Sequence, residues 1–173
     1  MSLSVGESGT MWDAGSLRRS GLRERVEHMF LGQYGHSFDD KFRLTVPAKF
    51  REPLADGAFV VQGLDNNLMV LTASAFETIY QRLMAMNMMD PAARALRRII
   101  LGNAAQLELD SAGRILIPQV LRDLAGLGNE AVLVGQGDYF EVWQPALWKT
   151  QEAELQNAEV NAQRFSTLDL STR

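Results

Sequence analysis

Cysteine is absent from the 173 residues, which excludes a disulfide scaffold and every thiolate metal site. Only two histidines are present, so a multi-histidine metal site within one chain is not expected. No apolar run approaches the roughly 20 residues of a membrane helix, and residues 1–28 lack the apolar stretch of about 7–15 residues found in secretion signals. We therefore expect a soluble, cytoplasmic protein without a membrane partner, metal or cofactor.

Positive charge is also scarce. The chain has 17 Lys and Arg residues against 21 Asp and Glu residues, which gives a net charge of -4. The part of the chain between residues 28 and 149 is acidic as well. Nucleic-acid binding would therefore depend on local groups of cations. Two such groups are present: Lys41, Arg43, Lys49 and Arg51 in the first, and Arg94, Arg97 and Arg98 in the second.

The two ends of the chain differ from its middle. Residues 1–28 are rich in Ser, Gly and Arg and show no sustained periodicity. We expect them to be a disordered extension, or the product of a mis-assigned start upstream of a native start at Met29. Residues 149–173 are polar, and we expect a C-terminal helix that ends in a frayed tail.

An internal repeat is the main feature of the sequence. Asp39–Pro47 aligns with Asp110–Pro118 at an offset of 71 residues. After one inserted residue, Val60–Gly63 aligns with Val132–Gly135, and the register then continues to the end of each copy. Polar and apolar classes match over some forty residues, so the chain contains two copies of one small module.

Both copies predict the same order of elements. An apolar segment and a turn precede a short alternating strand, a helix that starts at Pro47 or Pro118, two further strands and a closing helix. We expect the modules at 29–76 and 104–148, joined by a helical connection at 77–103. The predicted fold class is β-rich α+β. Because a module of this length buries little surface alone, the two must share a core.

The helical connection contains recognisable helix starts. Ser74 and Glu77 have the spacing of a capping box, and Asp90 before Pro91 can cap a second helix. In that second helix the pattern predicts an inward face and a solvated outward face. The inward residues are Ala95, Leu96, Ile99 and Ile100, and the outward ones are Arg94, Arg97 and Arg98.

The turn of each copy has the pattern D-x-x-x-R, from Asp39 to Arg43 and from Asp110 to Arg114. An Asp that opens a tight turn accepts backbone N–H groups and can also hold a guanidinium group. Two such turns would present a pair of cations suited to phosphates or guanine edges. The same spacing also occurs in simple surface ion pairs and in purely structural turns.

These motifs resemble the MraZ family, bacterial regulators with two modules of the AbrB/SpoVT type. The resemblance runs from Met29 to about Trp148, most of the chain. The segments that carry it are Met29–Gly32, His36–Asp39, Arg43–Arg51 and Asp110–Pro118.

The resemblance implies two intertwined, swapped-hairpin modules with a compact barrel-like core flanked by helices. It also implies a ring-like homo-oligomer that binds double-stranded DNA, at repeated elements in the promoter of the division and cell-wall gene cluster, its own gene included. Such a protein would be a nucleoid-associated regulator without a catalytic residue or a small-molecule substrate. The expected DNA-binding residues are Arg43, Arg114, Lys41, Lys49, Arg51 and Arg122. The expected turn-positioning residues are Asp39, Asp110 and Gly113.

The first turn departs from the family pattern at one position. Phe42 stands where the family usually has Gly, whereas the second copy keeps Gly113. A left-handed Phe42 would be strained. Either the first turn has another shape, or a contact of the side chain with a neighbour or with DNA compensates the strain. In the second copy Ala112 replaces Lys41, so that module would contact phosphate more weakly.

Two other functions are compatible with parts of the sequence. His36 beside Asp39 and Asp40 could suggest acid–base catalysis, but no second-copy His, nucleophile motif or phosphate loop accompanies it. The alternative is a non-catalytic protein-binding module, such as an antitoxin-like scaffold. Its adaptable contact surface would be the cluster of Met86, Met88 and Met89.

Overall fold

The computed structural model describes Val26 and residues 28–169. The expectations for the N-terminal 28 residues, a disordered extension or a mis-assigned start, lie almost entirely outside the described residues. The end of the expected frayed tail, residues 170–173, also lies outside them.

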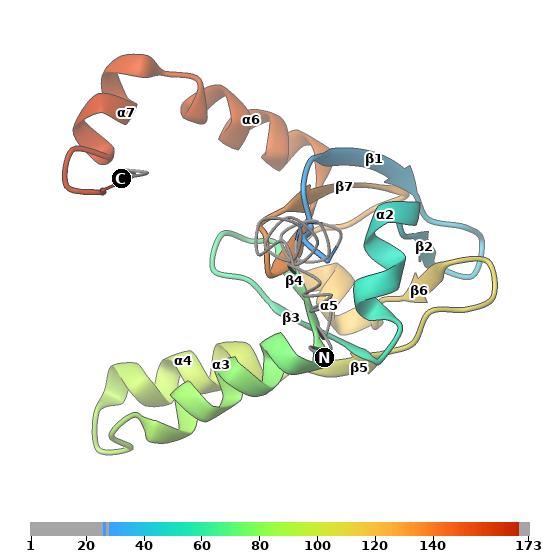
Figure 1. Ribbon diagram of the computed structural model, residues 1–173, viewed down its shortest axis with the longest axis horizontal. Helices are drawn as coiled ribbons and strands as arrows, with labels where there is room; N and C mark the ends of the chain where they lie inside the picture. The colour runs from blue at the N-terminus through green and yellow to red at the C-terminus, as the bar shows by residue number, and fades with distance from the viewer. Residues whose placement is uncertain (1–25, 27, 170–173) are drawn as a thin grey trace, which may run out of the picture.

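Among the described residues, eight strands form two antiparallel sheets (Figure 1). The larger sheet has six strands in the order β1-β7-β8-β4-β3-β5, and the smaller one pairs β2 with β6. The first copy supplies β1 (Gln33–Ser37), β2 (Arg43–Thr45), β3 (Ala58–Gln62) and β4 (Leu68–Thr72). The second copy supplies β5 (Ala105–Leu107), β6 (Arg114–Leu116), β7 (Glu130–Gly135) and β8 (Tyr139–Trp143).

The two copies exchange their first strands. Strand β1 of the first copy pairs with β7 of the second, and β5 of the second pairs with β3 of the first. The pairs β4–β8 and β2–β6 also join the two copies. The sheet is therefore symmetric: replacing each strand by its counterpart in the other copy gives the same pairs in the reverse order. This confirms the swapped, intertwined arrangement. The module boundaries at 76 and 104 stay predictions.

The large sheet is open rather than closed. Strands β1 and β5 lie at its two ends and do not pair with each other, so the expected barrel-like core is not a closed barrel. Closure would require β1 and β5 to meet. They instead form the two outer edges of the strand order.

One core is shared by both copies. Phe30, Phe50 and Phe140 are fully buried, with centroids 5.1 Å apart for Phe30–Phe50 and for Phe50–Phe140. Leu44 of β2 and Ile115 of β6, opposite each other in register, are buried in the same cluster. Because the core takes large side chains from both copies, neither copy could bury a comparable apolar surface alone.

Short helices follow the small sheet at equivalent positions. Helix α2 (Ala48–Arg51) continues into a 3-10 turn, η1 (Glu52–Leu54), and α5 (Gln119–Leu124) is its second-copy counterpart. The prolines Pro47 and Pro118 are the N-cap residues, one position earlier than a proline in the first helical turn would lie. Each helix buries one large residue, Phe50 or Leu121, against the shared core.

The helical connection is a hairpin of α3 (Ala73–Ala85) and α4 (Pro91–Leu101). The Asp90 cap is confirmed, because its Oδ1 accepts the Ala92 N–H at 2.8 Å. The capping box at Ser74 and Glu77 is wrong. Thr72 is the N-cap and accepts the Ala75 N–H at 3.1 Å, because α3 begins directly at the end of β4.

The outward face predicted for α4 is wrong for two of its arginines. Arg97 is half-buried and donates from Nε to the Leu83 carbonyl at 2.9 Å, and from Nη2 to two further carbonyls at the end of α3. Arg94 donates to the Met88 and Met89 carbonyls. Both arginines therefore satisfy carbonyls that the end of α3 and the following loop leave free. On the other face Ala95 is exposed and Ala93 is buried instead.

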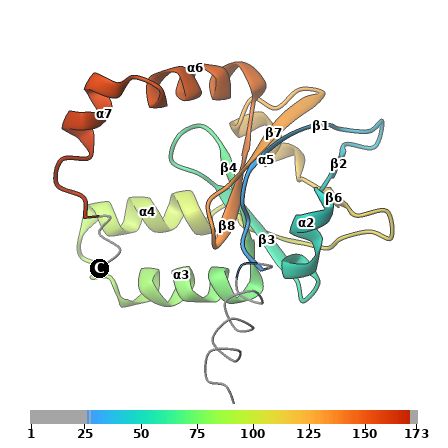
Figure 2. The same ribbon diagram turned by 45° about the horizontal axis from the view of Figure 1, so that its top comes forward.

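The C-terminal segment forms two helices, α6 (Pro145–Leu155) and α7 (Ala158–Arg164), where one helix with a frayed end was expected. Asn157 breaks the run, because its side chain accepts the Val160 N–H and starts α7. Both views show the α3–α4 hairpin and the α6–α7 arm on one side of the sheets and the β2–β6 end on the other (Figures 1 and 2). No helix within the described part of the chain is long and apolar enough to span a bilayer.

Candidate nucleic-acid interface

The first turn is organised by one carboxylate. Oδ1 of Asp39 accepts the backbone N–H of Lys41 at 3.0 Å and that of Arg43 at 2.9 Å. Oδ2 of Asp39 accepts the Arg43 Nε–H at 2.8 Å. The turn is closed by the Asp39 backbone N–H, which donates to the Arg43 carbonyl, and by the Phe42 N–H, which donates to the Asp39 carbonyl. The carboxylate thus fixes both the backbone of the turn and the direction of the arginine side chain.

The second turn repeats this geometry. Asp110 accepts the N–H groups of Ala112 and Arg114, each at 2.9 Å, and the Arg114 Nε–H at 2.8 Å. The backbone closure between Asp110 and Arg114 is also the same. Each aspartate therefore accepts three corresponding hydrogen bonds, two from backbone N–H groups and one from its arginine.

Pairing of β2 with β6 places the two turns side by side. In this antiparallel register Arg43 faces Leu116 and Thr45 faces Arg114, so the turns enter opposite ends of a ladder of three residue pairs, and both arginines lie on its same face. Arg114 Nη1 lies 3.2 Å from Asp39 Oδ2, and Arg43 Nη1 lies 3.7 Å from Asp110 Oδ2. Each carboxylate therefore faces both guanidinium groups. The four side chains are 25–30% exposed, and their formal charges cancel.

The same contacts lower the pKa of both carboxyl groups below the usual 3.8. For Asp39 the main cause is the hydrogen bond from the Arg43 backbone N–H, and partial desolvation opposes it. For Asp110 the corresponding cause is the Arg114 backbone N–H. Both aspartates are therefore ionised at neutral pH, and both arginines have fixed partners on their inner side.

The outer side of each guanidinium group is open. Within the described residues, Nη2 of Arg43 and of Arg114 takes part in no hydrogen bond, and both side chains are 29% exposed. Lys41 at the first turn and Lys49 on α2 are exposed. An anion that approached this end would meet N–H donors whose orientation is already set.

Arg51 and Arg122 each lie against the turn of the opposite copy. Arg51 donates from Nε to the Val46 carbonyl at 2.9 Å and fills the space beside Gly113, where any Cβ would clash with its guanidinium group. Arg122 lies over the ring of Phe42, with its Cζ 3.9 Å from the ring centroid. This role was not predicted. The signal in the sequence was the alignment of the two arginines in the repeat, but sequence gives no indication of what they touch.

Phe42 has a left-handed conformation, one of the alternatives that its alignment with Gly113 left open. Its φ is 57°, close to the 74° of Gly113, so the two turns have the same backbone shape despite the substitution. A non-glycine residue in this region costs about 1–3 kcal/mol, whereas a cation–π contact at an exposed site returns about 0.5–1 kcal/mol. The contact with Arg122 therefore offsets only part of the strain.

Among the described residues, His36 belongs to no group of side chains that could hold a metal ion. His36 lies in β1 opposite Ala131 of β7, and its side chain is half-buried. No group of three or more His, Cys, Asp or Glu side chains that could hold a metal ion occurs among residues 28–169 or at Val26. The structure joins the aspartates and arginines of the two turns in ion pairs.

Comparison with known proteins agrees with the repeat. The family model described as "MraZ protein, putative antitoxin-like" matches twice, at residues 29–99 and 100–170, and each match contains one turn. A protein of Roseiflexus castenholzii named "Transcriptional regulator MraZ" is 38% identical over 141 residues, which cover 81% of this chain and 99% of that protein.

Two further relatives have the same name. The protein of Thermomicrobium roseum is 41% identical over 142 residues, which cover 81% of this chain and 99% of that protein. The protein of Coxiella burnetii is 43% identical over 128 residues, which cover 70% of this chain and 84% of that protein. Taken with the two exchanged copies and their matching turns, these similarities show that the chain belongs to the MraZ family.

Proposed function

We propose that this protein is a DNA-binding transcriptional regulator, and that its two turns form the DNA-contacting end. The relatives named above are transcriptional regulators, which supports a regulatory function and a non-enzymatic one. The observation that carries the proposal is the pair of arginines, Arg43 and Arg114. Each is held by its own aspartate and by the aspartate of the other copy, and each keeps outer N–H donors available.

This geometry suits DNA better than a small anion. Arginine N–H donors can contact phosphate oxygens, or the O6 and N7 acceptors of guanine in the major groove. Because the aspartates fix the side chains beforehand, little conformational entropy is lost on binding. Lys41, Lys49, Arg51 and Arg122 would supply further phosphate contacts around the two turns.

The low positive charge of one subunit limits how strongly a single subunit can attract DNA. The four central charges of the turns cancel, and the chain as a whole is acidic. We propose that a ring-like homo-oligomer repeats this end of the molecule and binds DNA whose repeated elements match the subunit spacing. Linked sites gain avidity without new contacts. The proposed target is the promoter of the division and cell-wall gene cluster, its own gene included, which implies a cytoplasmic, nucleoid-associated protein.

A fluorescence anisotropy titration tests the proposal. The DNA is the duplex upstream of the protein's own gene, with shuffled DNA for comparison, at two salt concentrations. The variant Arg43→Ala/Arg114→Ala should lose sequence-preferring, salt-sensitive binding. The matched control is Arg82→Ala/Arg98→Ala, which removes the same charge from exposed positions on the α3–α4 hairpin and should bind as the unaltered protein does.

The number of repeats gives a second test. A duplex with several repeats should bind far more tightly than a duplex with one, because only the longer one engages several subunits. Equal affinity for both would refute the avidity. Equal affinity for promoter and shuffled DNA, with the double variant still folded and oligomeric, would refute specific DNA binding through the turns.

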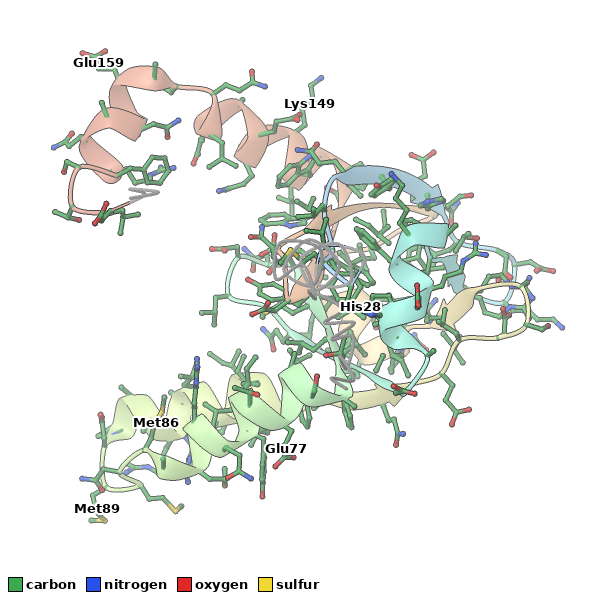
Figure 3. The ribbon with its side chains drawn as sticks, in the orientation of Figure 1. His28, Glu77, Met86, Met89, Lys149 and Glu159 are labelled. Atoms are coloured by element: carbon green, nitrogen blue, oxygen red, sulfur yellow. The ribbon has the colours of Figure 1, made fainter. Side chains whose placement is uncertain are left out.

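A second candidate is a protein-binding scaffold of the same architecture. Met88 is 60% exposed and Met89 is 81% exposed at the far end of the α3–α4 hairpin, where Met86 also lies (Figure 3). Flexible thioether side chains adapt to many partner surfaces, and the family model's own description includes the words "antitoxin-like". A scaffold would not bind DNA, and it would still bind its partner protein after both turn arginines were replaced.

A further inference from the structure

Phe42 is exposed and does not contribute to the hydrophobic core. Its side chain is 49% exposed at the tip of the first turn, and it belongs to none of the buried hydrophobic clusters. The second copy forms the same turn with Gly113, which takes a left-handed φ without steric cost. The turn itself therefore does not require an aromatic residue, and the strained conformation calls for another explanation.

Arg122 fixes where the ring lies. Its guanidinium group covers the ring at 3.9 Å from the centroid, and its half-buried side chain comes from α5 of the other copy. Phe42 as a whole residue is still 49% exposed with Arg122 in this position. The first turn thus presents a held apolar surface, whereas the second turn has only Ala112 and Gly113 at the corresponding positions.

Cationic side chains lie near the ring, two of them paired with the turn aspartates. Lys41 and Arg43 flank it in the chain, and Arg114 lies beside Arg43 through the shared aspartates. If these cations contact DNA as proposed above, the ring between them is brought to the same groove. The apolar group that a base pair offers in the major groove is the 5-methyl of thymine, and phenylalanine is one of the side chains that contact it.

We propose that Phe42, held by Arg122, contacts thymine methyl groups and so gives the first turn a sequence preference that the second turn lacks. The inference rests on the proposed function, because it assigns a base to the same DNA-contacting end. The two turns then contact unlike parts of one DNA element: the first reads an apolar group, and the second contributes its arginine alone.

Removing the methyl groups tests the inference directly. The duplex upstream of the protein's own gene is prepared with thymine and, separately, with deoxyuridine, which lacks only the 5-methyl group. The unaltered protein should bind the deoxyuridine duplex more weakly, by about 3–5-fold for each methyl contacted. Phe42→Gly and Phe42→Asn, two residues that accept a left-handed φ, should bind the thymine duplex more weakly and should not distinguish the two duplexes.

The controls separate this inference from the function on which it rests. Thermal melts and oligomeric state should show both Phe42 variants folded, since each suits the backbone. Equal binding of the two duplexes by the unaltered protein, or an unchanged methyl effect in Phe42→Gly, would overturn the inference. The function would still hold if Arg43→Ala/Arg114→Ala abolished specific binding in the same experiment. Absence of specific binding by the unaltered protein would refute both proposals.

Discussion

The first turn, residues 39–43, and the second turn, residues 110–114, share the same hydrogen bonds but differ in what lies against them. In the second turn Gly113 leaves room for the guanidinium group of Arg51, which reaches the Val46 carbonyl. In the first turn Phe42 fills the equivalent position, and Arg122 lies on its ring instead. The Arg122 Nε is buried without a hydrogen-bond partner within the described residues.

This difference shows which parts of the turn are interchangeable. The aspartate and the arginine four residues later set the backbone in both copies. The residue before the arginine can vary, because an arginine from the other copy adapts to it. The long arginine side chain can donate to a backbone carbonyl, as Arg51 does, or cover an aromatic face, as Arg122 does. The following predictions test whether the two turns respond alike or differently.

Of the changes tested, loss of the two turn carboxylates should lower the stability of the fold the most. Their folded pKa values lie below 3.8, so they stabilise the protein above that pH, and this stabilisation is lost as the pH falls through the folded values. The midpoint of urea unfolding should therefore drop in acid, and Asp39→Asn/Asp110→Asn should flatten that dependence.

The single variants sharpen the comparison. Asp39→Asn should destabilise more than Asp110→Asn, because Asp39 also accepts Arg114 Nη1 at 3.2 Å, whereas the converse contact is 3.7 Å long. Equal acid dependence in the double variant and the unaltered protein would contradict the role given to both carboxylates.

A methyl group added at Gly113 in the second turn should cause the next largest loss of stability. Gly113→Ala needs a left-handed alanine and displaces Arg51, which leaves the Val46 carbonyl unpaired. We expect a loss of about 2–3 kcal/mol in the free energy of unfolding. The control Gly126→Ala also has a positive φ but meets no atom within 4 Å, and should lose about 1 kcal/mol. Equal losses would show that the contact with Arg51 contributes nothing.

The two opposing arginines should differ in their contribution to stability. Arg51→Ala should lower the free energy of unfolding by about 1–2 kcal/mol, because a backbone carbonyl loses its partner. Arg122→Ala should change it by less than about 1 kcal/mol, since the lost cation–π contact is offset by removal of an unpartnered buried Nε. Chemical denaturation measures both values. A reversed order would mean that the aromatic contact holds the turns together more strongly than the hydrogen bond does.

Replacing Phe42 by glycine should have the smallest effect on stability. Relief of the left-handed strain favours the variant, whereas the lost cation–π contact and the greater freedom of glycine in the unfolded chain oppose it. We expect a gain of at most about 1 kcal/mol by chemical denaturation. A loss of several kcal/mol would show that the ring has a structural role that its exposure does not indicate.

Local features were predicted well from sequence, because they depend on neighbours in the chain. Strands such as β4 and β8 follow from alternation, and the Asp39–Arg43 turn follows from the reach of a short carboxylate. The start of α3 was misjudged by two residues. Thr72 still ends β4 while already capping the helix, a dual role that a capping pattern does not reveal.

The sequence by itself determined the repeat, the order of elements and the Asp–Arg turns, because each depends on residues close together in the chain. The tertiary structure alone decided that β1 pairs with β7 and β5 with β3, that the turns lie side by side, and that Arg51 and Arg122 cross to the opposite copy. The physical reason is that both copies have similar strands. Pairing within a copy and pairing between copies would satisfy similar backbone hydrogen bonds, and only burial of one shared core favours the exchange.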